Sequence, residues 1–136
     1  MILIDTSVLI DGLKGVKNPK TELLALIVKQ KVQYGISVYT YQEVLQGARD
    51  DREYKRLKEY LSTQKIYFLS ETVATYENAA RMFYDLRRKG VTVRGTIDIL
   101  IALTAIENGL FLLHSDRDFD VIAANVSDLK ALESLV

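Results

Sequence analysis

Short apolar runs alternate along this chain with longer stretches whose apolar residues recur at helical spacing. Brief runs of branched and aromatic residues bounded by polar ones are typical of buried strands. We expect such strands at residues 2–4, 34–38, 66–69 and 111–114, with one more within 126–132. We expect helices at residues 7–12, 19–30, 40–48, 50–61, 72–89, 96–107 and 118–124. Strands that alternate with helices predict an α/β fold with a central parallel sheet of four or five strands, covered on both faces.

Length and composition favour one folded domain that spans residues 1–136. The chain has 136 residues, of which 49% are hydrophobic, and this is enough to bury a single core. Its apolar runs are too short for a membrane span, and MILIDTS lacks the basic region of a signal peptide. The sequence has no cysteine, so disulfides and thiolate metal sites are excluded. We therefore expect a cytoplasmic protein without a membrane partner.

Four acidic residues stand at or near the points where an apolar run gives way to a helix. Asp5 directly follows the first expected strand, and Asp116 lies two residues after the end of the fourth. Glu43 lies in the helix that follows the second strand, and Asp98 lies in the first turn of the helix at 96–107. The carboxyl ends of parallel strands share one edge, so we expect these acids to converge there. Clustered carboxylates are costly unless a cation balances them, and a divalent cation held by carboxylates serves phosphoryl chemistry. The working hypothesis is a metal-dependent nuclease.

Three of these acids also have a purely structural explanation. Asp5 could cap the following helix through its side chain. Asp98 could lie in a first helical turn because the helix dipole favours negative charge there, although its apolar neighbours predict burial. Glu43, considered alone, has the surroundings of a surface residue. The nuclease hypothesis therefore depends on the four acids being brought together.

The segment SDRDFD offers several acids within one short stretch. Ser115 and Asp118 have the spacing of a capping box, which predicts a structural role for Asp118. Asp116 is then the best candidate ligand, with Asp120 as a candidate helper. His114 is the only histidine, and at the end of a strand we expect it to pack rather than to act as a base.

The formal net charge is zero, whereas general nucleic-acid-binding proteins usually carry a basic surface. The basic residues within 49–58 are interleaved with acids, so we expect a solvated helix face there. A second basic stretch has few acids nearby and precedes Asp98. Its members, which are candidate RNA phosphate contacts, are Arg87, Arg88, Lys89 and Arg94.

With all four acids in view, the chain resembles the PIN-domain ribonucleases, and most closely the VapC-type toxins of prokaryotic toxin–antitoxin systems. The motifs that carry the resemblance are LIDTSVLID, YTYQEVLQGAR, GTIDILIALTA and LLHSDRDFD. Each motif alone is weak, but their order and spacing run nearly from end to end of the chain. The resemblance implies an α/β/α sandwich around the parallel sheet.

The resemblance also assigns roles to individual positions. Asp5, Glu43, Asp98 and Asp116 match the acidic quartet of the family, which binds Mg²⁺ or Mn²⁺. Three of them, Asp5, Asp98 and Asp116, are expected metal ligands, whereas Glu43 could serve as a ligand or as a base. Whether one or two ions bind is left open.

Three neighbouring residues match positions around that quartet. Thr6 matches a hydroxyl often found beside the first acid, and Thr40 a threonine that commonly precedes the glutamate. His114 differs, because many family members have Thr or Ser two residues before the last acid. At this position the chain therefore offers an imidazole beside Asp116 where many family members offer a hydroxyl.

The implied activity is hydrolysis of RNA phosphodiester bonds, with tRNA or ribosomal RNA as substrates. VapC-like proteins typically form homodimers and are inhibited by a small antitoxin protein that inserts an Arg or Lys into the acidic site. One alternative is a PIN-like binding module that holds a protein or RNA partner without catalysis. A receiver domain fits less well, since no acid directly follows the middle run at residues 66–69 before Glu71. A haloacid-dehalogenase-like phosphatase also fits less well, since the first strand is followed by Asp5-Thr6-Ser7 rather than by Asp-x-Asp.

Overall fold

The computed structural model describes residues 1–135 and contains one parallel sheet of five strands. The strand order across the sheet is β3-β2-β1-β4-β5, so the first strand of the chain lies at its centre. The strands are β1 (Ile2–Ile4), β2 (Tyr34–Ser37), β3 (Ile66–Tyr67), β4 (Phe111–Leu113) and β5 (Lys130–Ala131). All four pairings between neighbouring strands are parallel, which confirms the predicted fold class.

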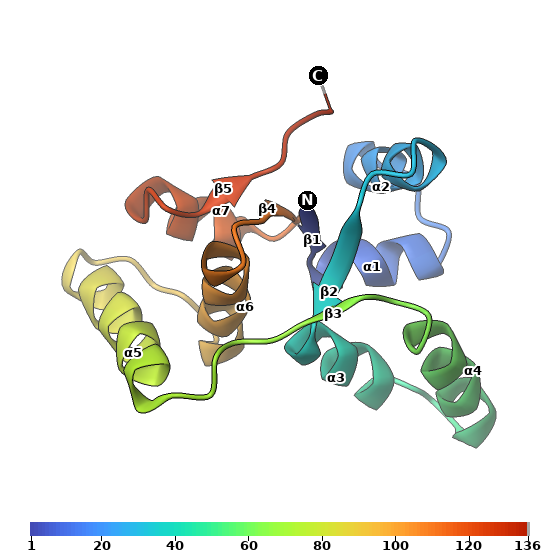
Figure 1. Ribbon diagram of the computed structural model, residues 1–136, viewed down its shortest axis with the longest axis horizontal. Helices are drawn as coiled ribbons and strands as arrows, with labels where there is room; N and C mark the ends of the chain where they lie inside the picture. The colour runs from blue at the N-terminus through green and yellow to red at the C-terminus, as the bar shows by residue number, and fades with distance from the viewer. Residues whose placement is uncertain (136) are drawn as a thin grey trace.

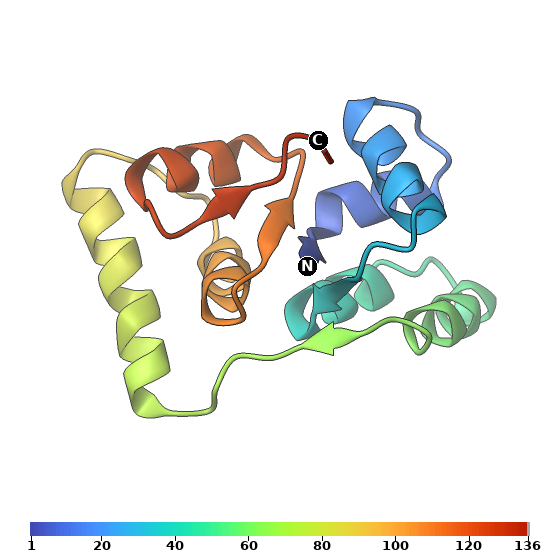
Figure 2. The same ribbon diagram turned by 45° about the horizontal axis from the view of Figure 1, so that its top comes forward.

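Helices cover the sheet in two groups, as Figures 1 and 2 show. The first group is α1 (Thr6–Leu13), α2 (Pro19–Lys29), α3 (Val38–Gln46) and α4 (Asp51–Leu61). The second group is α5 (Val73–Arg88), α6 (Thr96–Glu107) and α7 (Arg117–Asn125). Among residues 1–135, no helix is long and apolar enough to cross a membrane.

Alternate side chains of the central strands enter two separate hydrophobic cores. Leu3 and Leu112 pack in the core built mainly from α5, α6 and α7. Ile2, Ile4 and Leu113 pack in the core built mainly from α1 to α4. Because both faces of the central strands are buried, these strands read as continuous apolar runs in the sequence. This burial fixes the strand ends, and so the residues that follow them, at one edge of the sheet.

Several element boundaries differ from the prediction because local caps decide them. The α3 helix begins at Val38 rather than at Thr40, since the Ser37 side chain accepts a hydrogen bond from the Thr40 backbone N–H at 3.0 Å. Thr72, expected to be the first helical residue, forms the corresponding N-cap of α5. The α1 helix runs past Gly12 to Leu13, so the expected end at that glycine was wrong.

Candidate active site

Asp5 lies between β1 and α1 and is almost fully buried, with 3% of its surface exposed. Its backbone N–H donates to the Leu113 carbonyl of β4 at 2.9 Å, which ties this position to the neighbouring strand. Its carboxylate Oδ2 accepts from the Ser7 backbone N–H at 3.1 Å and from the Ser7 hydroxyl at 2.6 Å. Asp5 therefore caps α1, as the structural explanation required, and still lies at the carboxyl edge of the sheet.

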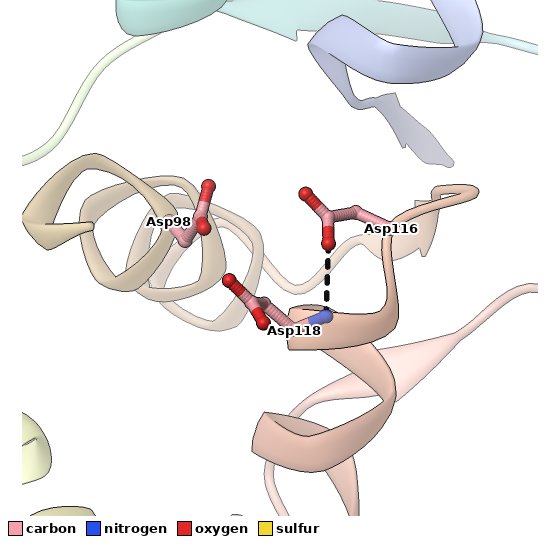
Figure 3. Close-up of side chains that lie close together, drawn as sticks. All are labelled: Asp98, Asp116 and Asp118. Carbon is pink, nitrogen blue, oxygen red and sulfur yellow. Dashed lines mark hydrogen bonds between the residues drawn. The ribbon is translucent and has the colours of Figure 1, made fainter. Parts of the chain in front are cut away.

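Three aspartates come together beside this edge. Asp98 is in the first turn of α6, Asp116 precedes α7, and Asp118 is in the first turn of α7. Each offers a carboxylate oxygen, and the three oxygens lie within 4.8 Å of one another. Figure 3 shows the three side chains facing a common space. Asp116 also caps α7, because its Oδ1 accepts from the Asp118 backbone N–H at 2.9 Å.

The electrostatics of Asp98 link this group to the two remaining acids. The pKa of Asp98 is raised from 3.8 to about 7, first by burial and then by the negative charges around it. In decreasing order of effect, these charges belong to Asp116, Asp5, Asp118 and Glu43. Asp5 and Glu43 are outside the tightest group, yet they act on the same carboxyl. Burial likewise raises the pKa of Asp5, against the lowering effect of its bonds to Ser7.

Glu43 is held in place by threonine hydroxyls. It lies in α3, and its Oε1 accepts a hydrogen bond from the Thr6 hydroxyl of α1 at 2.7 Å. The same Thr6 hydroxyl lies 3.0 Å from the hydroxyl of Thr40, which is fully buried. Thr6 and Thr40 thus join α1 to α3 and orient the glutamate toward the acidic edge.

His114 and Asp120 are not members of the three-aspartate group. The His114 ring is buried, packs on Phe119 with 5.3 Å between ring centroids, and has Nε2 3.6 Å from Asp120 Oδ1. Burial lowers the pKa of His114. Both residues line a separate hollow next to Asn18 and Lys20. The expectation that His114 packs agrees with this placement, and Asp120 pairs with the histidine rather than with the other acids.

The predicted RNA-contact residues fall into two sets. Arg87 and Arg88 are in the last turn of α5 and Lys89 is its C-cap, and all three are exposed. The Arg88 guanidinium donates to the Tyr84 hydroxyl at 3.0 Å. Arg94, in contrast, is bound to the acidic group itself: its Nε lies 3.1 Å from Asp118 Oδ2 and its Nη2 3.4 Å from Asp116 Oδ1.

The capping box predicted for Ser115 and Asp118 is absent. The N-cap of α7 is Asp116 and not Ser115, so the capping-box assignment fails. The Asp118 carboxylate instead accepts from Arg94 and contributes to the group of three acids. The signal available in the sequence was the i, i+2 spacing of two acids just after a strand, which places both near the same sheet edge.

The donor set at this edge suits a hard divalent cation. It consists of carboxylate oxygens, which Mg²⁺ and Mn²⁺ prefer over softer metals. A cation would also relieve the repulsion that raises the pKa of Asp98. An ion held here could polarise a phosphoryl oxygen or a water molecule. The residues therefore fit metal-assisted hydrolysis.

Comparisons with known proteins point to one family. The family model described as "PIN domain" matches residues 2–125. The chain is similar to ribonuclease VapC11 of Mycobacterium tuberculosis, with 31% identity over 132 residues that cover 96% of this chain and 97% of VapC11. Its fold is similar to VapBC2 from Rickettsia felis, with a TM-score of 0.73, 19% identity, and 97% and 98% of the two chains covered. The fold is also similar to FitAcB from Neisseria gonorrhoeae, with a TM-score of 0.72 and 21% identity, covering 98% of this chain and 97% of the FitAcB chain.

Proposed function

This chain belongs to the PIN-domain family, and we propose that it is a metal-dependent endoribonuclease, the toxin of a VapBC-type toxin–antitoxin pair. The observation that carries the proposal is the group formed by Asp98, Asp116 and Asp118, whose oxygens lie within 4.8 Å of one another at the carboxyl edge of the sheet. Ligands of open α/β sheets gather at this edge. The raised pKa of Asp98 supports a site that is completed by positive charge.

We assign cation binding to Asp5, Asp98 and Asp116, as the sequence suggested, and add Asp118 to them. Mg²⁺ or Mn²⁺ is the proposed cofactor because the donors are carboxylates. Such an ion supplies Lewis acidity, which makes a water molecule more nucleophilic and stabilises charge on the leaving oxygen of the RNA. Ser7 holds Asp5 Oδ2 with two hydrogen bonds, so this carboxylate is already oriented before any ion binds.

Glu43 is the proposed proton acceptor of the reaction. Its Oε1 accepts from the Thr6 hydroxyl at 2.7 Å, which leaves Oε2 as the oxygen that takes a proton from the attacking water. Thr6 orients this carboxylate directly, and Thr40 acts through its 3.0 Å contact with the Thr6 hydroxyl. A role of Glu43 as a further cation ligand uses the same orientation, so the Thr6 contact serves either assignment.

The proposed partners follow from the relatives and from the charge distribution. The substrate is RNA, with tRNA and ribosomal RNA as first candidates, and the exposed cations Arg87, Arg88 and Lys89 are proposed phosphate contacts. A small antitoxin protein is a proposed partner, since the structural relatives include VapBC complexes. A homodimer is also proposed, on the family resemblance alone. We further propose that residues 1–136 form one domain and act in the cytoplasm.

The proposal is tested by cleavage of a mixture of tRNA and ribosomal RNA. The purified protein is assayed with Mn²⁺, with Mg²⁺ and with EDTA, beside Asp98→Asn. The matched control is Asp128→Asn, because Asp128 is exposed and its side chain makes no hydrogen bond or ion pair within residues 1–135. We expect metal-dependent cuts at discrete positions that are lost in Asp98→Asn and retained in the control.

Two outcomes would contradict the proposal in different ways. Cleavage that survives Asp98→Asn would separate the activity from the acidic group. Absence of cleavage with either metal, in a folded protein free of any co-purified inhibitor, would favour a PIN-like binding module that holds a partner without catalysis.

A further inference from the structure

Arg94 makes three contacts with the acids of the candidate metal site. Its guanidinium Nε lies 3.1 Å from Asp118 Oδ2, and its Nη2 lies 3.4 Å from Asp116 Oδ1. Its backbone N–H also donates to Asp118 Oδ2 at 3.3 Å. The Asp118 side chain is only 10% exposed, whereas the Arg94 side chain is 74% exposed. A solvent-exposed cation thus neutralises acids that are partly withdrawn from water.

The same two carboxylates belong to the group that fits a divalent cation. Asp116 and Asp118 are two of the three aspartates whose oxygens lie within 4.8 Å of one another. An ion bound among them would place two positive charges close to the guanidinium, and like charges at such distances repel strongly. The oxygens of Asp116 and Asp118 that accept from the guanidinium would also have to give up these charge-assisted hydrogen bonds to bind an ion directly. Arg94 and the cation therefore favour different states of one site.

We propose that Arg94 is an internal counter-ion that competes with the divalent cation for Asp116 and Asp118, and so sets the cation concentration at which the site fills. The proposal rests on the proposed function only in that these acids bind a divalent cation. Because most of the Arg94 side chain is exposed, it can leave the acids for solvent without opening the hydrophobic core. Its displacement would free a cation beside the site where the RNA phosphate has to lie.

Competition has a thermodynamic consequence that does not involve RNA. If the cation binds only when Arg94 has left the acids, the apparent affinity equals the intrinsic affinity multiplied by the fraction of protein in which Arg94 is not bound to them. Removing Arg94 should then tighten cation binding and, by the same factor, lower the stability of the metal-free protein. At saturating cation the stabilities should converge, since Arg94 no longer contacts the acids in either protein.

The test measures Mn²⁺ binding by calorimetry in the full chain and in Arg94→Gln. Arg94→Gln removes an exposed ion pair in which one guanidinium contacts two carboxylates. From the usual strength of such a pair, we expect Mn²⁺ to bind about three- to tenfold more tightly to the variant. The control for charge alone is Arg117→Gln. Arg117 lies between Asp116 and Asp118 in sequence and is exposed, and its side chain makes no ion pair or hydrogen bond within the described residues 1–135. For this control we expect a change of less than about twofold.

Arg94→Lys is a second variant, which keeps the positive charge but loses the planar guanidinium. Its Mn²⁺ affinity should fall between that of the unmodified chain and that of Arg94→Gln. Urea unfolding in EDTA should show Arg94→Gln to be less stable than the unmodified chain, and the difference should vanish with saturating Mn²⁺. A tenfold change in affinity corresponds to about 1.4 kcal/mol in this comparison.

Three results would overturn the proposal. Weaker Mn²⁺ binding in both Arg94 variants would mean that Arg94 orients the acids for the metal instead of competing with it. Equal tightening in Arg117→Gln would reduce the effect to net charge. Absence of Mn²⁺ binding in every protein would remove the cation from the site. None of these measurements uses RNA, so loss of cleavage with intact competition would contradict the proposed function alone.

Discussion

Replacing Asp98 by Asn should stabilise the metal-free protein at alkaline pH, although it removes a proposed cation ligand. The pKa of Asp98 is raised to about 7 by burial and by four neighbouring acids. In the unfolded chain this carboxyl has a pKa near 3.8. Between pH 3.8 and about pH 7, the folded protein therefore binds more protons than the unfolded chain. Stability then falls as pH rises from about 4 to about 7, and asparagine removes that loss.

The magnitude follows from the size of the pKa change. One tenfold step in the protonation equilibrium is about 1.4 kcal/mol, so a rise from 3.8 to about 7 corresponds to at most about 4 kcal/mol. Asp98 is half-buried, and solvent screens its interactions, so we reduce this to about 2 kcal/mol. At pH 8.5 the variant should be more stable by about this amount. The difference should be smaller at pH 5, part of the way through this window, and it should vanish below about pH 4, where the unfolded chain also keeps the proton.

The assay is urea unfolding in EDTA at pH 5 and pH 8.5, followed by circular dichroism. Asp128→Asn is the control for the loss of one carboxylate at an exposed position. In saturating Mn²⁺ the order should reverse, because the intact site gains more stability from the ion than the variant does. A variant that is destabilised equally at both pH values would refute the reasoning, since neither burial nor the neighbouring acids would then disfavour the charged form of Asp98 in the folded protein.

Three further substitutions test separate parts of the structure. Thr6→Val removes the hydroxyl that holds Glu43, so the RNA cleavage rate should fall by roughly 10- to 100-fold while the midpoint of urea unfolding barely moves. An unchanged cleavage rate would mean that Glu43 needs no orientation. Ser7→Ala removes the 2.6 Å bond to Asp5, so the pKa of Asp5 should rise further and the pH at which Mn²⁺ binds should shift upward; a downward shift would contradict this account of the carboxylate. Gly35→Ala would place a Cβ 2.5 Å from the Lys65 carbonyl oxygen and 2.6 Å from the ring of Tyr67, so overpacking between β2 and β3 should lower the free energy of unfolding by about 1–3 kcal/mol; unchanged urea unfolding would show that β3 can move away at no cost.

Much of the fold could be read from the sequence because strands and helices differ in the spacing of their apolar residues. The run at residues 2–4 and the stretch at 96–107 are buried on nearly all sides, and both were assigned correctly. The order of the strands could not be predicted this way, since it depends on which helices pack together across each face. The ends of α3 and α5 were missed because Ser37 and Thr72, each one of several adjacent residues able to cap, were not recognised as the caps.

The acidic edge was predictable for the same reason, whereas its detailed contacts were not. Asp5 and Asp116 follow central strands, so the parallel topology alone brings them to one edge. The i, i+2 spacing of Asp116 and Asp118 places both near this edge, but the contacts that Asp118 makes depend on the rotation of the first turn of α7. The pairing of Arg94 with Asp118 joins positions 24 residues apart, and charge spacing along the chain gave no sign of it.

The central claim is that the acids at the sheet edge act on RNA through a bound divalent cation. The measurement that tests it most directly is the rate of RNA cleavage against Mn²⁺ concentration, with Mn²⁺ occupancy followed in the same samples by electron paramagnetic resonance. We predict that rate and occupancy rise together with one midpoint, and that both are lost in Asp116→Asn, which keeps a side chain able to cap α7. Cleavage at Mn²⁺ concentrations that leave the site empty, or full occupancy without cleavage, would contradict the claim.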